Sequence, residues 1–359
     1  MPEPSSLSRR YTTLVVAAVS LIVLTSVALL VPVPYVTMSP GPAFDTLGSP
    51  RIAGGKPLLT FGDDVKTYPT TGSLDFTTVS VTRPDSQVSI VDAIRSYADK
   101  DVAVVPKSLV YPDDESEKES SAQSAAQLAS SKDASKVAAL RAAGYDVPGR
   151  PVIAAVVKDG AAAGKLESGD IVTSVDGTEV TSSDAVVKAV GSVEPGDTVE
   201  VGIERKGTPR TVSIVTRADP QDPDVPRLGI SIGTKFSFPI KVDNNVGREI
   251  GGPSAGSMFA LAIYDKLTPG QLTGGKTIAG TGEISADGVV GAIGGVRQKM
   301  AGAAEAKATI FLVPAANCAE AADGDDHGLK LVKITKLDDA ISSLEALAKD
   351  PKAKVPSCS

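Results

Sequence analysis

An uncharged segment near the N-terminus constrains this chain more than any other feature. From Tyr11 to Phe44 the sequence has no charged residue, and Leu14–Val33 is almost wholly apolar. Twenty helical residues span about 30 Å, which is the thickness of the hydrocarbon core of a bilayer. A buried helix of a soluble domain fits this all-round apolar surface less well. We therefore expect a transmembrane helix here.

Charges on either side of the segment predict its orientation. Arg9 and Arg10 directly precede it, and Asp45 is the first charge after it. Positive residues favour the cytoplasmic side, so we expect a single-pass protein of the cell membrane whose body lies outside the cytoplasm. A cleaved signal peptide is the alternative. Its apolar region would be unusually long, however, and no clear A-x-A site follows it.

Composition excludes several classes of site. The net charge is −7 and no basic stripe is present, which argues against a nucleic-acid partner. The single histidine, His327, and two cysteines are too few for a metal site, and we expect neither metal nor cofactor. Outside the cytoplasm Cys318 and Cys358 have two alternatives, a disulfide that ties down the tail or two free thiols.

The rest of the chain predicts an α+β multidomain protein. Asp113–Lys136 is rich in Ser, Ala, Glu and Gln, which suits a solvated helix or a mobile segment and not a core. Asp219–Pro226 is rich in Pro and Asp and marks a domain boundary. The predicted parts are an N-terminus with an anchor (1–35), a small β-containing domain (36–145), a second domain (146–218) and a last α+β domain (227–349).

The second domain carries a recognisable string, Gly164–Gly177. It resembles the bacterial PDZ pattern, in which a short helix leads through Gly-Asp into a buried strand that ends at a turn. PDZ domains bind extended peptide ends by adding a strand to a sheet edge. The resemblance implies a groove between Ile153–Val157 and the helix Ser182–Val190. A β-rich spacer without a ligand is the alternative, because the pattern marks the fold more than the groove.

In the last domain, Ser254 has the surroundings of a nucleophile. Gly251-Gly252-Pro253 precede it, and an apolar-periodic run follows through Leu267. Proline is tolerated in the first turn of a helix, so Ser254 should lie at a helix N-terminus. Unpaired backbone N–H groups at such an end are suitable donors for the oxyanion of acyl transfer. A serine at this place can equally serve only as a cap.

A serine hydroxyl needs a base, and Lys299 is the best candidate. Gly294-Gly295 open a predicted helix on which Val296, Lys299 and Met300 share one face. Burial on an apolar face disfavours the charged lysine, and Ser–Lys pairs are a known variant of nucleophile and base. The alternative is a lysine without a catalytic role, whose amine extends to solvent. His327 lies in a polar loop and is a poor candidate.

Three blocks together point to a family. Gly252–Gly256, Thr281–Ile284 and Gly294–Lys299 resemble, in this order, the peptidase motifs of Lon proteases. With the anchor and the PDZ-like string, the chain looks like the membrane-anchored or secreted PDZ–Lon proteins of Gram-positive bacteria. The resemblance implies Ser254 as nucleophile, Lys299 as general base and Thr281 as the hydroxyl that orients the lysine. Gly251 departs from the family, since many Lon proteases have an acidic residue there.

A nucleotide site is not expected. Gly270–Thr277 fits the spelling G-x-x-x-x-G-K-[ST], but that loop requires a strand before it and a helix after it, and the sequence predicts the reverse. The predicted function is an ATP-independent, membrane-anchored serine endopeptidase that acts on unfolded or flexible peptides captured by the PDZ-like domain. The alternative is an inactive envelope scaffold that recruits partners. The oligomeric state stays open.

Overall fold

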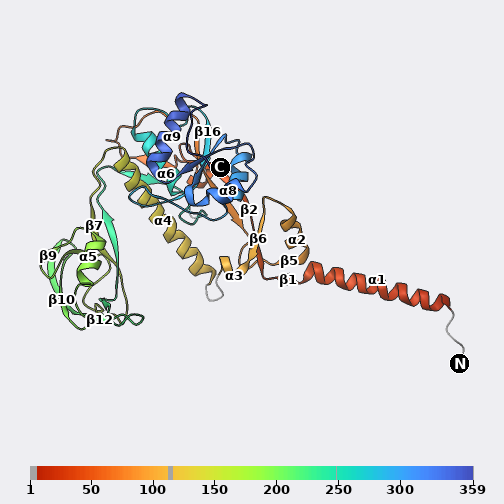
Figure 1. Ribbon diagram of the computed structural model, residues 1–359, viewed down its shortest axis with the longest axis horizontal. Helices are drawn as coiled ribbons and strands as arrows, with labels where there is room; N and C mark the ends of the chain where they lie inside the picture. The colour runs from red at the N-terminus through yellow and green to blue at the C-terminus, as the bar shows by residue number, and fades with distance from the viewer. Residues whose placement is uncertain (1–5, 112–115, 248, 359) are drawn as a thin grey trace. The chain divides into compact units, whose positions relative to one another are not determined.

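In the computed structural model, which describes residues 6–111, 116–247 and 249–358, the chain divides into two compact units. The large unit combines residues 1–144 with 240–359, and the inserted unit is Tyr145–Pro239 (Figure 1). Both contain helices and strands, so the predicted α+β multidomain class is confirmed.

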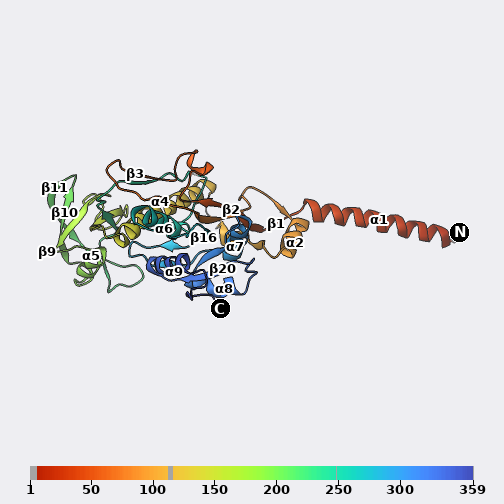
Figure 2. The same ribbon diagram turned by 90° about the horizontal axis from the view of Figure 1, so that it is seen from above.

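Helix α1 (Ser6–Leu30) begins the large unit and projects away from the rest of it (Figure 2). Within the described ranges it is the one helix long and apolar enough to cross a membrane, with its most apolar window at Arg10–Val27. Every side chain of that window is exposed. Signal sequences share this length and composition. The chain continues into β1 (Pro32–Val33), which pairs with β5 (Val88–Ser89).

A six-stranded sheet organises the large unit. Its order is β20-β19-β16-β4-β2-β6; the first four strands run parallel, and β2 and β6 are antiparallel to their neighbours. The strands are β2 (Tyr35–Asp45), β4 (Ser73–Val81), β6 (Ala103–Pro106), β16 (Thr277–Gly280), β19 (Ile310–Pro314) and β20 (Lys330–Ile334).

The sheet contradicts the predicted domain at 36–145. Strands β2, β4 and β6 come from that segment, yet β4 pairs with β16 from beyond the inserted unit. The two halves therefore share one sheet and one core. Alternation in the sequence identifies strands but carries no information about which distant strand each one pairs with.

Helices cover both faces of the sheet. On one face, Met258 of α6 (Gly256–Leu267) packs against Gly280 and Leu312. On the other, α7 (Val296–Glu305) and α8 (Cys318–Ala322) pack over Ala279 and Phe311. Successive strand residues point to opposite faces, which is why neighbours such as Ala279 and Gly280 meet different helices.

Helix α4 (Glu117–Ala142) differs from the prediction for Asp113–Lys136, of which residues 113–115 lie outside the described part. Ser116 caps it and forms a capping box with Glu119. Its first turns are largely exposed, as expected for a solvated helix, whereas Leu128, Val137 and Leu140 are buried and the helix packs on α6. The C-terminal part of the helix therefore belongs to the core, which the composition of the segment did not predict.

The remaining elements of the large unit are short. They are η1 (Arg51–Ala53), β3 (Leu59–Phe61), α2 (Ile90–Ala98), α3 (Lys107–Val110), β15 (Val242–Asn244), β17 (Glu283–Ile284), β18 (Val290–Gly291), η2 (Ala315–Asn317) and α9 (Leu337–Lys349). Strand β3 pairs with β15, and β17 pairs with β18.

The inserted unit is a sheet of order β11-β10-β8-β7-β14 with β9 (Thr178–Glu179) paired to β8, and helix α5 (Ser183–Val190) packs against it. The strands are β7 (Gly149–Val156), β8 (Ile171–Val175), β10 (Thr198–Arg205), β11 (Thr208–Val215) and β14 (Ile230–Phe236). Its core includes Ile153, Val172 and Ile203, all nearly inaccessible to solvent.

The predicted boundary at Asp219–Pro226 is wrong. Strands β12 (Arg217–Ala218) and β13 (Pro226–Arg227) pair across it, so this segment is the turn of a hairpin inside the inserted unit. The chain then forms β14, which pairs with β7, and the unit ends at Pro239. Proline and aspartate favour turns and linkers alike, and local composition does not separate the two.

A disulfide closes the C-terminal tail. Cys318 of α8 and Cys358 are bonded, with their Cα atoms 4.9 Å apart. The tail lies along the outer edge of β20, where the Lys333 N–H donates to the Pro356 carbonyl oxygen at 3.0 Å. Of the two alternatives for the cysteines, the structure contains the bridge, and the tail covers an otherwise open edge of the sheet.

Removing this bridge should loosen the tail and β20. The disulfide spans 40 residues, and loops of this size stabilise a fold by about 2–4 kcal/mol. In the Cys318→Ser, Cys358→Ser variant we expect faster amide hydrogen exchange in β20 and residues 350–358. Reductant should reproduce this change in the native protein and have no effect on the variant. If β20 and the tail are equally protected from exchange in the native protein and in the variant without reductant, the disulfide does not stabilise them as assigned.

Candidate active site

Ser254 lies in a tight loop directly before α6, whose N-cap is Ala255. Gly252 in that loop has φ +81°, a left-handed conformation that glycine adopts without strain. The carbonyl oxygen of Ser254 accepts from the Gly282 N–H at 2.8 Å. The loop is thus held to the segment that follows β16, and the half-buried Ser254 hydroxyl lies close to the end of that strand.

Helix α4 supports the same loop from the other side. The Ser131 hydroxyl donates to the Pro253 carbonyl oxygen at 2.8 Å, and the Gly252 N–H donates to the Ser124 carbonyl oxygen at 3.0 Å. A Cβ at Gly251 would lie 2.9 Å from the Ser124 Cβ, closer than real Cβ atoms approach. The packing of α4 therefore explains why no acidic side chain stands at position 251.

Lys299 on α7 reaches Ser254 from the opposite side of the loop. Its side chain is 3% exposed, and Nζ donates to Ser254 Oγ at 2.8 Å and to Thr281 Oγ1 at 3.0 Å. Thr281 is fully buried, and its hydroxyl donates in turn to the Ser254 carbonyl oxygen at 3.0 Å. The structure thus brings together all three residues that the sequence analysis selected.

The surroundings of Lys299 favour its neutral form. Burial lowers the pKa of Lys299 from 10.5 to about 8, and the more distant negative charge of Glu283 opposes this effect. A lysine accepts a proton only when it is neutral, and the lowered pKa gives this amine a far larger neutral fraction at ordinary pH than an exposed lysine has. Ser254 and Lys299 are therefore arranged as a hydroxyl beside an amine able to deprotonate it.

The backbone donors near Ser254 differ from the expectation. The Gly256 N–H donates to the Pro253 carbonyl oxygen at 3.3 Å, and the Ser257 N–H donates to Gly282 at 3.0 Å. The N–H groups of Ser254 and Ala255 have no acceptor among the described residues. The free donors therefore belong to Ser254 itself and to the N-cap residue, and not to the first turn of α6.

A cleft of about 610 Å³ opens in front of the site. Ser254, Ala255 and Lys299 line it together with Thr77–Val81, the second half of β4. Strand β16 ends at Gly280, which pairs with Phe76, so beyond Phe76 the β16 side of β4 has no strand partner among the described residues. An unpaired strand edge consequently runs along the cleft beside Ser254.

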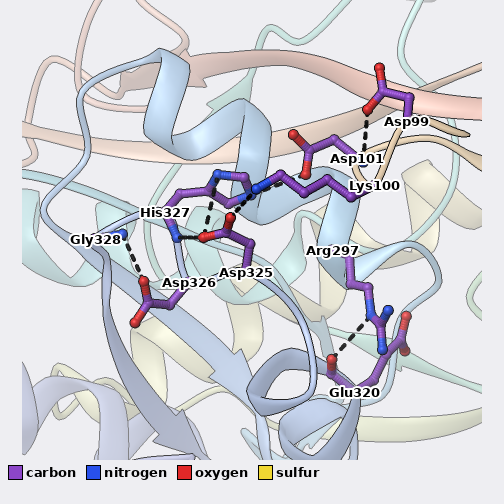
Figure 3. Close-up of polar contacts among 9 residues, drawn as sticks. All are labelled: Asp99, Lys100, Asp101, Arg297, Glu320, Asp325, Asp326, His327 and Gly328. Carbon is purple, nitrogen blue, oxygen red and sulfur yellow. Dashed lines mark hydrogen bonds and ion pairs between the residues drawn. The ribbon is translucent and has the colours of Figure 1, made fainter.

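His327 belongs to a different cluster. Its Nε2 lies 3.2 Å from Asp101 Oδ1, and Lys100 pairs with Asp325 beside it (Figure 3). These contacts join the turn after α2 to the loop before β20 at the surface. His327 therefore serves packing between surface loops, and its interactions include neither Ser254 nor Lys299.

The segment Gly270–Thr277 lies between α6 and β16, the order that the sequence analysis expected. The amine of Lys276 donates to the Leu347 carbonyl oxygen of α9 at 3.0 Å. Without a preceding strand and a following helix, the loop lacks the backbone cradle that binds phosphates in nucleotide sites.

Comparison with known proteins agrees with this geometry. Residues 124–216 match the model of the PDZ domain, and residues 245–347 match that of the Lon protease (S16) C-terminal proteolytic domain. The chain combines a PDZ domain with a Lon-type proteolytic domain. Ser254, Thr281 and Lys299 all lie within the residues that match the Lon-type domain.

Individual relatives cover one domain each. A probable periplasmic serine endoprotease DegP-like from Halomonas elongata is 42% identical over 72 residues, which is 20% of this chain and 15% of that protein. A Lon protease from Methylocella silvestris is 38% identical over 104 residues, 28% of this chain and 13% of the relative. The chain thus spans less than a sixth of the length of either.

Among solved structures, the PDZ domain of an SdrC-like protein from Listeria innocua is 30% identical. The match covers 23% of this chain and 92% of that domain, with a TM-score of 0.22.

The apolar cavity of the PDZ domain borders β14 as well as Val157, the last residue of the strand predicted to form the groove. Strand β7, which contains Ile153, pairs with β8 on one side and with β14 on the other, so it is not an edge. Among the described residues, β14 is the edge strand on the β7 side of the sheet, and β11 is the other edge. The largely apolar cavity of about 660 Å³ lies beside β14, lined by Val187 and Val190 of α5 and by Ile230 and Ile232 of β14.

The wrong choice of edge strand follows from the wrong domain boundary at Asp219–Pro226. The sequence analysis assigned Ile230–Phe236 to the last domain, which left β7 as the apparent edge strand. The alternation of Ile230 and Ile232 was the available signal, together with the Leu228-Gly229 turn, where Gly229 has φ +71°.

The pKa of Lys299 can be measured directly. With ¹³Cε-labelled lysine, one resonance should titrate near pH 8, well below exposed lysines, because burial disfavours its charge. That resonance should be missing in Lys299→Arg and present in Lys276→Arg. A spectrum in which every lysine titrates near pH 10.4 would contradict the buried, partly neutral amine.

Proposed function

We propose that this protein is an ATP-independent, membrane-anchored serine endopeptidase in which Ser254 is the nucleophile, Lys299 the general base and Thr281 the residue that positions the lysine. The observation that carries the proposal is the 2.8 Å contact between Lys299 Nζ and Ser254 Oγ inside a Lon-type domain. A nucleophile within hydrogen-bond reach of a buried base is the arrangement that covalent catalysis requires.

The first half of the reaction forms an acyl-enzyme. Neutral Lys299 takes the proton of the Ser254 hydroxyl as Oγ bonds to the substrate carbonyl carbon, and the carbonyl oxygen becomes negative. The N–H groups of Ser254 and Ala255, which have no acceptor among the described residues, lie next to Oγ in the chain and stabilise this charge. The C–N bond then breaks, and the Lys299 ammonium returns the proton to the leaving amine.

The second half releases the product. A water molecule loses a proton to neutral Lys299 while its oxygen attacks the acyl carbon, and Ser254 Oγ leaves with the proton that the lysine gives back. Throughout, Thr281 Oγ1 accepts one N–H of Lys299 and keeps the amine directed at Oγ. Its own hydroxyl hydrogen is occupied by the Ser254 carbonyl oxygen, which determines the direction of that acceptor.

The cleft favours an extended substrate. The unpaired edge of Thr77–Val81 borders Ser254, and a strand edge binds extended peptide by main-chain hydrogen bonds. A folded substrate does not offer a free extended strand, so unfolded or flexible segments are the proposed substrates. The described residues form no nucleotide loop at Gly270–Thr277, in keeping with a reaction that needs no ATP.

Helix α1 is the proposed anchor, with the catalytic part outside the cytoplasm. Its apolar length supports a span, Arg9 and Arg10 before it support the orientation, and the Cys318–Cys358 bridge suits an oxidising compartment. The PDZ domain supplies substrate capture in this proposal, because such domains bind peptide ends at an edge strand beside a helix. Here these are β14 and α5.

Alanine substitutions test the catalytic assignment. Ser254→Ala and Lys299→Ala should each lower hydrolysis of an unfolded protein at least about 1,000-fold, and Thr281→Val up to about 100-fold through loss of orientation. The matched control is Ser257→Ala, one turn along the chain from Ser254. It removes a buried hydroxyl that has no hydrogen-bond partner among the described residues. Full activity in Ser254→Ala or Lys299→Ala would refute the assigned pair, and a lack of hydrolysis by the unmodified protein would favour the envelope scaffold.

The groove of the PDZ domain is tested separately. Val187→Asp places a charge in the apolar cavity, and it should weaken binding of peptides with apolar C-termini at least about tenfold. The reason is that the binding free energy lost with a buried aliphatic contact exceeds about 1.4 kcal/mol. Val215→Asp on β11 is the control, since that exposed side chain lies outside the cavity. Fluorescence anisotropy of labelled peptides measures both. Equal affinities would place the peptide elsewhere.

A further inference from the structure

Helix α2 presents two large apolar side chains to the outside. Ile94 is 65% exposed and Tyr97 is 82% exposed. They are three residues apart and therefore adjacent on one face of the helix. Ala93 and Ser96, on another face, are half-buried where α2 packs near β6 and β2. One face of α2 thus belongs to the fold, and the other leaves an aliphatic and an aromatic side chain uncovered.

The position of α2 relates this face to the proposed anchor. Strand β1 follows α1 directly and pairs with β5 in the register Pro32↔Ser89 and Val33↔Val88. Helix α2 begins at Ile90, the residue after β5. Both views show α2 beside the end of α1, and the two helices are in contact (Figures 1 and 2).

The pairing of β1 with β5 also places α2 at a definite depth in the bilayer. The apolar stretch that starts at Leu14 reaches Val33, and twenty residues match the roughly 30 Å of hydrocarbon, so β1 lies where that layer ends. Main-chain pairing holds β5 level with β1. The headgroup layer beyond it is about 5–8 Å deep on each side, and the start of α2 therefore falls within it.

Helix α2 is also held at both ends. Ser89 Oγ accepts from the Asp92 N–H at 3.1 Å and caps the first turn. After the last turn, Lys100 pairs with Asp325, and Asp101 contacts His327 Nε2 at 3.2 Å (Figure 3). Strand pairing at one end and this polar cluster at the other keep the exposed face in a constant orientation.

We propose that α2 is a second membrane contact, a short interfacial helix that inserts Ile94 and Tyr97 among the lipid headgroups next to the anchor. Tyrosine suits this layer because its ring is apolar and its hydroxyl is polar. Asp92 and Arg95 on the same helix carry opposite charges, so insertion depends on apolar contact and not on anionic lipid. The inference rests on the proposed anchoring by α1 and is independent of catalysis.

The absence of tryptophan from the chain permits a direct test. Full-length Tyr97→Trp is reconstituted in nanodiscs, one copy per disc, with brominated or ordinary phosphatidylcholine. We expect blue-shifted emission that brominated lipid quenches. Adding Ile94→Glu should shift the emission back to the red and remove the quenching. Both substituted side chains are exposed, so circular dichroism should show an unchanged fold.

Two further single-tryptophan variants make the outcomes distinct. Leu21→Trp in α1 should be quenched. Val289→Trp should not be quenched, because that exposed residue bridges to Lys336 at the start of α9, and α9 lies away from α1 in both views.

Each pattern of quenching has one reading. If the tryptophan at position 21 is quenched but the tryptophan at position 97 emits as it would in water, the docking of α2 is overturned. The anchoring by α1 is then still supported. Blue-shifted but unquenched emission from position 97 would show that this side chain is covered by the protein itself and not by lipid, and it would overturn the docking of α2. An unquenched tryptophan at position 21 would refute the anchor and the docking together, while hydrolysis in detergent reports on catalysis separately.

Discussion

The contact between Lys299 Nζ and Ser254 Oγ depends on keeping an amine out of water. An exposed lysine is almost fully charged at neutral pH and has no lone pair for a proton. At 3% exposure the charged form loses its hydration, and the pKa of Lys299 falls to about 8. The two hydroxyl groups of Ser254 and Thr281 then replace water as partners of the amine. The proposed chemistry follows from this burial.

That burial requires elements from both ends of the chain. Strand β4 and helix α4 precede the inserted PDZ domain, and β16, α6 and α7 follow it. The first group supplies a wall of the cleft and supports the loop that contains Ser254, and the part of the chain with the second group contains Ser254, Thr281 and Lys299. A fragment limited to the matched residues 245–347 would lack the β4 edge and the hydroxyl of Ser131. The insertion therefore interrupts one folding unit without dividing it.

Local patterns were sufficient for much of the secondary structure. The strands around Phe76, Ile153 and Ile171 and the helices that contain Lys299 and Val187 all stand close to where the sequence placed them. Ser254 and Lys299 were selected from glycine-rich blocks next to predicted helices, and Thr281 from the resemblance of three ordered blocks to the motifs of Lon proteases. The errors concerned which elements pack together, namely β4 with β16, β14 with β7 and α4 with α6. Each pair joins segments that are distant in the sequence. The composition of α4 also differs little from that of a solvent-exposed helix.

The sequence by itself determined the apolar first helix, the α+β class and the choice of Ser254, Thr281 and Lys299 as candidate residues, because these depend on local periodicity and on short blocks of residues. Only the tertiary structure decided that 36–144 completes the sheet of the large unit, that β14 pairs with β7 and borders the apolar cavity, and that Cys318 meets Cys358. Each of these is a contact between distant segments. Strand edges, helix faces and backbone N–H groups are chemically alike along the whole chain, so their partners are chosen by packing.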